Sequence, residues 1–271
     1  MNISLGQYFP AKSIIHSLDP RAKVVSGILF MVAAFLCKNI CSFGLLLAFA
    51  ALLILCSKIP FRIILKGLRP IIFIMLFTTV INVFFTTGET LVLSWKFVQI
   101  YLEGIYNAVF MAVRIVVLIL GTSIFMTYTT TPIALTDAIE MLLSPLKKLH
   151  VPVHEFAMMM TITLRFIPTL VEETDKIIRA QKARGTDFES GNLIQRAKAM
   201  VPILIPLFVS AFRRADELAT SMECRSYRGG EGRTRLRVLK FRIRDVFALL
   251  FVVLFGAMIV CCNLWAPGYT M

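Results

Sequence analysis

Residues 164–185, LRFIPTLVEETDKIIRAQKARG, are the stretch around which the chain is organised. They begin apolar and end charged, and the spacing of their apolar positions predicts a long amphipathic helix. Residues 209–229, VSAFRRADELATSMECRSYRG, follow the same plan. Each stretch carries an arginine where its helix is expected to end: Arg184 before Gly185, and Arg225 before Ser226. The sequence therefore predicts two long helical arms, each with a basic tip.

The usual preferences of residues at a helix C-terminus are enough to explain a single Arg-Gly tip. The negative end of a helix favours Arg184, and Gly185 can adopt the left-handed conformation that often ends a helix. A second basic tip favours binding instead, because an arginine fork makes bidentate bonds to carboxylates on a partner. Two tips would form a two-point docking site, which indicates a coupling device more than a catalyst. Five acids precede the tips, and most of them are expected to pair locally with Lys176, Arg179, Arg213 or Arg214: Glu172, Glu173, Asp175, Asp216 and Glu217.

Composition indicates a membrane protein. Of the 271 residues, 58% are hydrophobic, and the mean hydropathy is +0.78, too apolar for a soluble domain of this size. Lys38 and Asn39 separate the first two apolar runs and would be costly in hydrocarbon, so a tight hairpin is expected there. The fold class is an all-α integral membrane protein, with about five transmembrane helices and a large helical insert between the fourth and fifth. The expected spans are residues 24–36, 40–56, 70–87, 104–128 and 245–264.

Basic residues gather in particular segments of a chain whose net charge is +13. Residues 57–69 carry four basic residues and no acid, and residues 129–244 carry 19 basic and 12 acidic residues. By the positive-inside rule these segments are cytoplasmic, together with the N-terminus. The expected division is a membrane region at 1–128, cytoplasmic or interfacial coupling helices at 129–244, and a last span with a short external tail at 245–271.

Nucleic-acid binding is the alternative interpretation of this charge, but no nucleic-acid motif accompanies it, so no nucleic-acid partner is expected. Membrane lipid is the expected partner instead. Residues 233–244, RTRLRVLKFRIR, alternate basic and apolar residues and are expected to lie on anionic lipid.

Few residues carry chemistry of their own. Arg114 is the one basic residue well inside an expected span, and both a functional role and a structural role toward the insert are open for it. The histidines lack metal-ligand spacing, and no Walker A, GxSxG or HExxH motif is present, so no metal, cofactor or enzymatic activity is expected. Asp19 and Pro20 are favourable helix-start residues, and Arg21 would hold that end in the cytoplasm.

Four short elements occur in order along nearly the whole chain: HSLDPRAK at 16–23, TTP at 130–132, LRFIPT at 164–169 and AQKARG at 180–185. Together they resemble the transmembrane T component of energy-coupling factor (ECF) transporters, the EcfT/CbiQ family. The resemblance implies a multi-pass protein of a bacterial or archaeal cell membrane. Such a protein joins two ABC-type ATPase subunits to one or more S components, which capture a vitamin or a transition-metal ion.

The resemblance also assigns the tips. In the family, two motifs of the type Ala-Arg-Gly, at the tips of crossed coupling helices, dock into grooves on the two ATPases. Here the two motifs are Ala183-Arg184-Gly185 and Cys224-Arg225-Ser226. The second keeps the arginine but loses the flanking Ala and Gly. A substrate-translocating permease of another transporter class is the alternative, and it would need polar groups along a mid-membrane pathway, which the spans offer sparsely.

Overall fold

The structure is a computed structural model and describes residues 8–86, 90–95, 98–186, 188, 192–229 and 239–265. The chain divides into two compact units. The membrane unit comprises the described residues of Gly6–Ala138 and Val238–Met271, and the insert unit comprises those of Ile139–Arg237.

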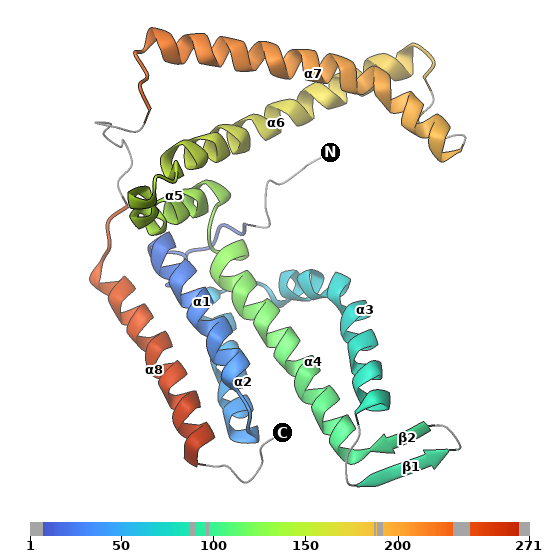
Figure 1. The fold of residues 1–271 in the computed structure, drawn as a ribbon, viewed down its shortest axis with the longest axis vertical. Coiled ribbons are helices and arrows are strands. Elements are labelled where there is room, and N and C mark those ends of the chain that lie inside the picture. Colours follow the sequence, from blue (N-terminus) through green and yellow to red (C-terminus); the bar gives the residue numbers. More distant parts are fainter. Residues whose placement is uncertain are drawn as a thin grey trace. The chain divides into compact units, whose positions relative to one another are not determined.

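Helices dominate the membrane unit (Figure 1), and the expected all-α class is confirmed. Its helices are α1 (Pro20–Leu36), α2 (Ile40–Ser57), α3 (Phe61–Phe85), α4 (Leu102–Thr122), the π-helical turn η1 (Ser123–Tyr128) and α8 (Ile243–Trp265). One addition was not expected: strands β1 (Leu91–Trp95) and β2 (Val98–Tyr101) form an antiparallel hairpin between α3 and α4. Leu, Val, Ile and aromatic residues in these runs have strand propensity, and Trp95 pairs with Val98.

The break between α1 and α2 lies at Lys38 and Asn39, as the sequence predicts. The backbone N–H of Asn39 donates to the Ser42 hydroxyl oxygen at 3.0 Å, and that hydroxyl donates to the Asn39 carbonyl at 2.7 Å. These bonds satisfy backbone groups where α2 begins. The chain can therefore reverse between two apolar helices with its polar groups paired.

Aromatic rings from α1, α2 and α8 form the centre of the membrane unit. Phe30 stacks on Phe49 with ring centroids 5.6 Å apart, and Phe49 stacks on Phe255 at 4.0 Å. Gly121 of α4 lies against the buried Phe30, and a Cβ atom at Gly121 would overlap that ring. The close approach of α4 to α1 therefore requires glycine at this position.

Five helices within the described residues are long and apolar enough to cross a membrane. Four overlap expected spans: α2, α3, α4 with η1, and α8. The fifth is Ile194–Cys224, within a helix that was expected in the insert, whereas α1, with 17 residues, is short for a span. Ile194–Cys224 qualifies because residues 199–212 are nearly all apolar, although its mean hydropathy of 1.3 is the lowest of the five. Which of these two helices crosses the bilayer stays a prediction.

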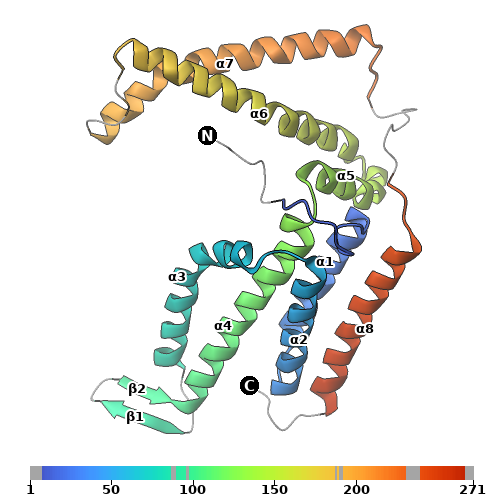
Figure 2. The same cartoon turned by 180° about the vertical axis from the view of Figure 1, so that it is seen from behind.

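The insert unit contains η2 (Ser144–Leu149), α6 (Val153–Ala183) and α7 (Leu193–Cys224), and α5 (Pro132–Leu142) leads into it. α5 ends before a 3-10 turn that starts at Ser144-Pro145. The two helical arms predicted from residues 164–185 and 209–229 belong to α6 and α7, and each of these helices is one continuous element in spite of internal prolines. α6 and α7 cross each other (Figure 1), and the view from behind agrees (Figure 2).

Half of the segment expected to lie on lipid, residues 233–238 of 233–244, falls outside the described residues. Residues 239–242 have no regular structure, and α8 begins immediately after them. Its lipid contact stays a prediction.

Candidate docking site at two helix tips

The first tip is the end of α6, where Arg184 is the capping residue and Gly185 takes a left-handed φ of +87°. The Gly185 N–H donates to the Lys182 carbonyl at 3.0 Å, and the Thr186 N–H donates to the Gln181 carbonyl at 3.1 Å. This pair of bonds is the Schellman ending, which folds the chain back over the last helical turn. A Cβ atom at Gly185 would meet nothing within 4 Å, so the backbone angle, and not space, favours glycine here.

The second tip is the end of α7, and its backbone follows the same pattern. Arg225 is the capping residue, and Ser226 takes a left-handed φ of +54°. The Ser226 N–H donates to the Glu223 carbonyl at 2.8 Å, and the Tyr227 N–H donates to the Met222 carbonyl at 3.1 Å. The departure from Ala-Arg-Gly therefore leaves the helix ending intact. The departure adds conformational strain at Ser226, because a residue with a side chain is disfavoured at positive φ by about 1 kcal/mol.

Each tip presents one arginine to solvent. Arg184 and Arg225 are both exposed and occupy the same position relative to their helix endings. Within the part of the chain that the structure describes, neither forms an ion pair with a carboxylate. The helix dipole favours a cation at this end, and the planar donor fork stays available for a partner's carboxylate. The two tips are therefore the candidate docking site.

The crossing of α6 and α7 sets where the tips lie. Glu173 of α6 meets Ser210 of α7, while Gln181, eight residues later, meets Pro202, eight residues earlier on α7. The two helices are therefore antiparallel where they cross. Their C-terminal ends point away from each other, so the tips stand at opposite ends of the pair (Figures 1 and 2). The 31 residues of α6 alone span about 46 Å along a straight axis.

A polar clamp centred on Glu173 holds this crossing. Its Oε1 accepts the Ser210 hydroxyl at 2.5 Å, and its Oε2 accepts Nη2 of Arg214 at 3.0 Å. The Ser210 hydrogen bond, followed by the Arg214 charge, holds the pKa of Glu173 below its ordinary value, so the carboxylate is ionised at neutral pH. Arg214 was among the cations expected to pair with these acids, and it reaches Glu173 from the other helix. The crossing brings a partner from the other helix within reach.

The N-terminal motif Asp19-Pro20-Arg21 starts α1, as the sequence predicts. Asp19 Oδ1 accepts the Arg21 N–H at 2.9 Å, and Pro20 is the first helical residue. The motif also reaches across the membrane unit. The Asp19 N–H donates to Asp245 Oδ1 at 2.7 Å, and Arg21 Nη2 donates to the Leu239 carbonyl at 2.7 Å. The start of α1 is thus tied to the segment that enters α8.

Asp245 is a residue whose role sequence reasoning missed. It is buried, with 2% of its surface exposed, and its second oxygen accepts the Arg242 N–H at 2.7 Å. Beside this pair, the buried Lys23 donates to the Thr129 carbonyl at 2.8 Å and so ties α1 to the end of η1. The only signal for Asp245 in the sequence is an acid in the first turn of a helix, which is usually a capping residue.

Arg114 contacts other helices of the membrane unit. Its Nη2 donates to the Cys37 carbonyl at the end of α1 at 2.6 Å, and its guanidinium lies 5.2 Å from the centre of the Phe43 ring. It borders a cavity of about 380 Å³ that Asn82 and Asn107 also line. A helix C-terminus and an aromatic face both attract a cation, so the contacts favour a structural role.

Fold and tips together define a class: a multi-pass helical membrane protein that carries two crossed, arginine-tipped helices. Residues 11–236 match the family described as cobalt transport protein, CbiQ. The chain is 55% identical over 254 residues to the energy-coupling factor transporter transmembrane protein EcfT of Ruminiclostridium cellulolyticum, covering 94% of each chain. It is 52% identical over 265 residues to EcfT of Clostridium kluyveri, covering 97% of this chain and 98% of the relative. With EcfT of Bacillus subtilis it shares 47% identity over 255 residues, which are 94% and 96% of the two chains.

The chain belongs to this EcfT/CbiQ family of transmembrane transporter components. The resemblance drawn from the four sequence elements is thereby confirmed. Family membership places the chain among transport proteins of the membrane and not among enzymes.

Proposed function

We propose that the chain is the coupling subunit of an ECF-type importer. In this role it transmits ATP-driven motion of two ABC-type ATPase subunits to an S component that captures a vitamin or a transition-metal ion. One observation carries the proposal: two helices with the same Schellman ending each present an arginine that has no ion pair among the described residues, at opposite ends of one crossed pair. Two separate ATPase subunits need two separate contacts, and the crossed pair offers them.

The clamp at the crossing supports transmission of motion. A pair of helices pinned at Glu173 by Ser210 and Arg214 moves as one lever when its ends are pushed, whereas an unpinned pair would slide. Closure of the ATPase pair upon ATP binding would shift the tips and change the orientation of the two helices. The same helices would pass that change to the S component.

Exposed apolar side chains supply a surface for the membrane side of this coupling. On α7, Ile194, Phe208 and Phe212 are 72%, 60% and 69% exposed. Such side chains are unfavourable in water and are suited to lipid or to an apolar membrane partner. α7 therefore combines an apolar body with a charged end, as a helix that connects a membrane protein to a cytoplasmic one requires.

The proposed orientation places both tips and the N-terminus in the cytoplasm of a bacterial or archaeal cell. The strongly basic segments, 57–69 and 129–244, then lie on that side. Residues 1–128 and 245–271 would hold the protein in the membrane, and residues 129–244 would carry the coupling helices. ATP hydrolysis and substrate capture belong to the partner subunits in this proposal.

Charge reversal tests the docking contacts. Arg184→Glu with Arg225→Glu should reduce the amount of ATPase that copurifies with the chain by about tenfold or more, because both charge-assisted contacts become repulsive. Arg179→Glu with Arg213→Glu is the matched control, since it changes the same charge on the same two helices away from their ends. Undiminished copurification and transport by the tip variant would show that the tips are not the docking contacts.

A further inference from the structure

Helix α3 has a basic first half that no acid balances. Lys58 precedes it, and Arg62, Lys66 and Arg69 lie within it at spacings of four and three residues, so these three side chains share one face. Pro70 comes next and lies inside the helix. A proline has no N–H to donate to the carbonyl four residues earlier, and α3 changes direction within its course (Figure 1). The basic face thus ends at an elbow.

The first arm of the elbow is held in place by packing. Ile64 is buried with 1% of its surface exposed, and Gly67 lies so close to the Tyr128 hydroxyl that a Cβ atom there would overlap it. Ile64 and Gly67 are three residues apart and face the bundle, while Lys66 and Arg69 are exposed. The position of the two cations is therefore fixed by the fold.

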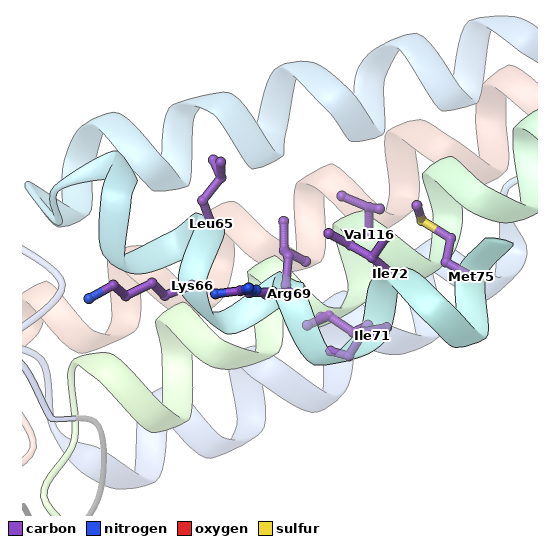
Figure 3. Close-up of a pocket in the computed structure, with 9 residues that line it drawn as sticks. Leu65, Lys66, Arg69, Ile71, Ile72, Met75 and Val116 are labelled. Atoms are coloured by element: carbon purple, nitrogen blue, oxygen red, sulfur yellow. The ribbon is translucent and has the colours of Figure 1, made fainter.

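A cavity of about 470 Å³ opens in the elbow. Its cationic lining is Lys66 and Arg69, and its apolar lining includes Ile72 and Met75 beyond the proline and Val116 and Ile119 of α4. Figure 3 shows Lys66 and Arg69 toward one end of the cavity, and Met75 and Val116 toward the other. The wall of the cavity is nearly all apolar, the two cationic side chains border it at one end, and its volume is typical of ligand pockets.

The two cations have no carboxylate partner among the residues that the structure describes. A free inorganic anion would satisfy the cations and leave the apolar end empty. A neutral lipid would fill the apolar end and leave the charges unmatched. The neighbouring surface of α3 is exposed and apolar, with Phe73 at 76% and Leu76 at 62%, as expected of a surface that faces acyl chains. An anionic lipid matches both ends and this surface.

We propose that the elbow of α3 is a binding site for one anionic phospholipid, with its phosphate on Lys66 and Arg69 and an acyl chain along Ile72, Met75, Val116 and Ile119. Anionic headgroups attract basic residues near the membrane surface. The bound lipid would brace the proline bend and fix α3 against α4. The site stands on contacts of the membrane unit and is independent of the docking tips.

Native mass spectrometry of the delipidated full chain in detergent tests the site, with phosphatidylglycerol and phosphatidylcholine titrated separately. The first phosphatidylglycerol should bind more tightly than the first phosphatidylcholine. Lys66→Gln with Arg69→Gln should weaken the phosphatidylglycerol by about 30-fold, on the scale of two basic residues near an anionic headgroup, and leave phosphatidylcholine unchanged. Lys66→Arg should retain the preference because the charge stays.

Lys58→Gln with Arg62→Gln is the matched control, because it removes the same amount of charge from the start of the same basic segment, at positions that do not line the cavity. An equal loss of phosphatidylglycerol in this control would overturn the site and leave only diffuse charge attraction. A second measurement repeats the titration with the subunits that copurify with the chain. Displacement of the lipid by those subunits would also overturn the proposal, since the elbow would then be a protein contact.

Discussion

Gly185 and Ser226 occupy the same left-handed position in two matching helix endings, although only one of them is glycine. Their φ angles are +87° and +54°, and in each case the N–H of this residue and of the next one close the last helical turn. The two helix endings therefore have the same backbone conformation, and they differ in the conformational strain of the residue at positive φ. A docking partner would meet an arginine on the same scaffold at both ends of the crossed pair.

Removing the side chain at Ser226 should stabilise the second tip. Ser226→Gly relieves the left-handed strain and should raise the free energy of unfolding by a few tenths to about 1 kcal/mol, while Gly185→Ala should lower it by about 1 kcal/mol. Thermal unfolding of the full chain in detergent measures both. Ser226→Ala serves as the control, because it removes the hydroxyl and keeps the strain. If this control stabilises the chain as much as the glycine variant does, the hydroxyl and not the φ angle is responsible.

Acid should weaken the crossing of α6 and α7. The pKa of Glu173 is lowered in the folded state by the Ser210 hydrogen bond and by Arg214. Its folded pKa therefore lies below the unfolded value of about 4.3, so the stabilisation is complete above that value and is lost as pH falls through the folded pKa. Glu173→Gln should cost about 1 kcal/mol at pH 7, and the difference from the unmodified chain should vanish in acid.

The control for this pH experiment is Glu172→Gln, the exposed neighbour on the same helix. Unfolding is followed from pH 7 to pH 3 for the three chains. A difference between the Glu173 variant and the unmodified chain that persists unchanged at pH 3 would contradict an ionic clamp.

Sequence patterns predicted the features that depend on residues near one another in the chain. The break at Lys38 and Asn39, the start of α1 at Asp19 and the ends of α6 and α7 at Arg184 and Arg225 are all local events. Capping, apolar runs and helix-ending residues determine them, and a few neighbouring residues carry the whole signal.

Contacts between distant residues could not be predicted in the same way. Asp19 and Asp245 are 226 residues apart, and Arg114 and Cys37 are 77 apart. No local pattern distinguishes Asp245 from any other acid in a first helical turn, and its burial results from packing of α8 beside α1. Likewise, Glu173 has nearby cations on its own helix, and it contacts Ser210 and Arg214 only because α6 and α7 cross at this point. Tertiary packing overrides local pairing in such cases.

Asp245 should be one of the most sensitive positions of the membrane unit. Its two oxygens accept the backbone N–H groups of Asp19, in a buried bond, and of Arg242, in a partly buried one, each at 2.7 Å. Asp245→Ala leaves both donors without a partner and should cost about 3 kcal/mol, whereas Asp245→Asn keeps one acceptor and should cost about half as much. Denaturant unfolding in mixed micelles measures the loss, with the exposed Asp216→Ala as control. Equal, small effects at the two positions would show that the Asp245 bonds contribute nothing to stability.

Arg114 should contribute to stability and not to the transport step. Its guanidinium joins the Cys37 carbonyl at 2.6 Å and the Phe43 ring at 5.2 Å, so Arg114→Ala leaves a helix C-terminus without its cation and should cost about 2 kcal/mol. Arg114→Lys keeps the charge but loses the planar fork, and it should recover part of the loss. Substrate uptake per folded molecule, measured in vesicles beside the unfolding free energy, separates the two roles. For a structural residue, uptake scales with the amount of folded protein. A stable Arg114→Ala protein that no longer supports uptake would instead assign Arg114 to the transport mechanism.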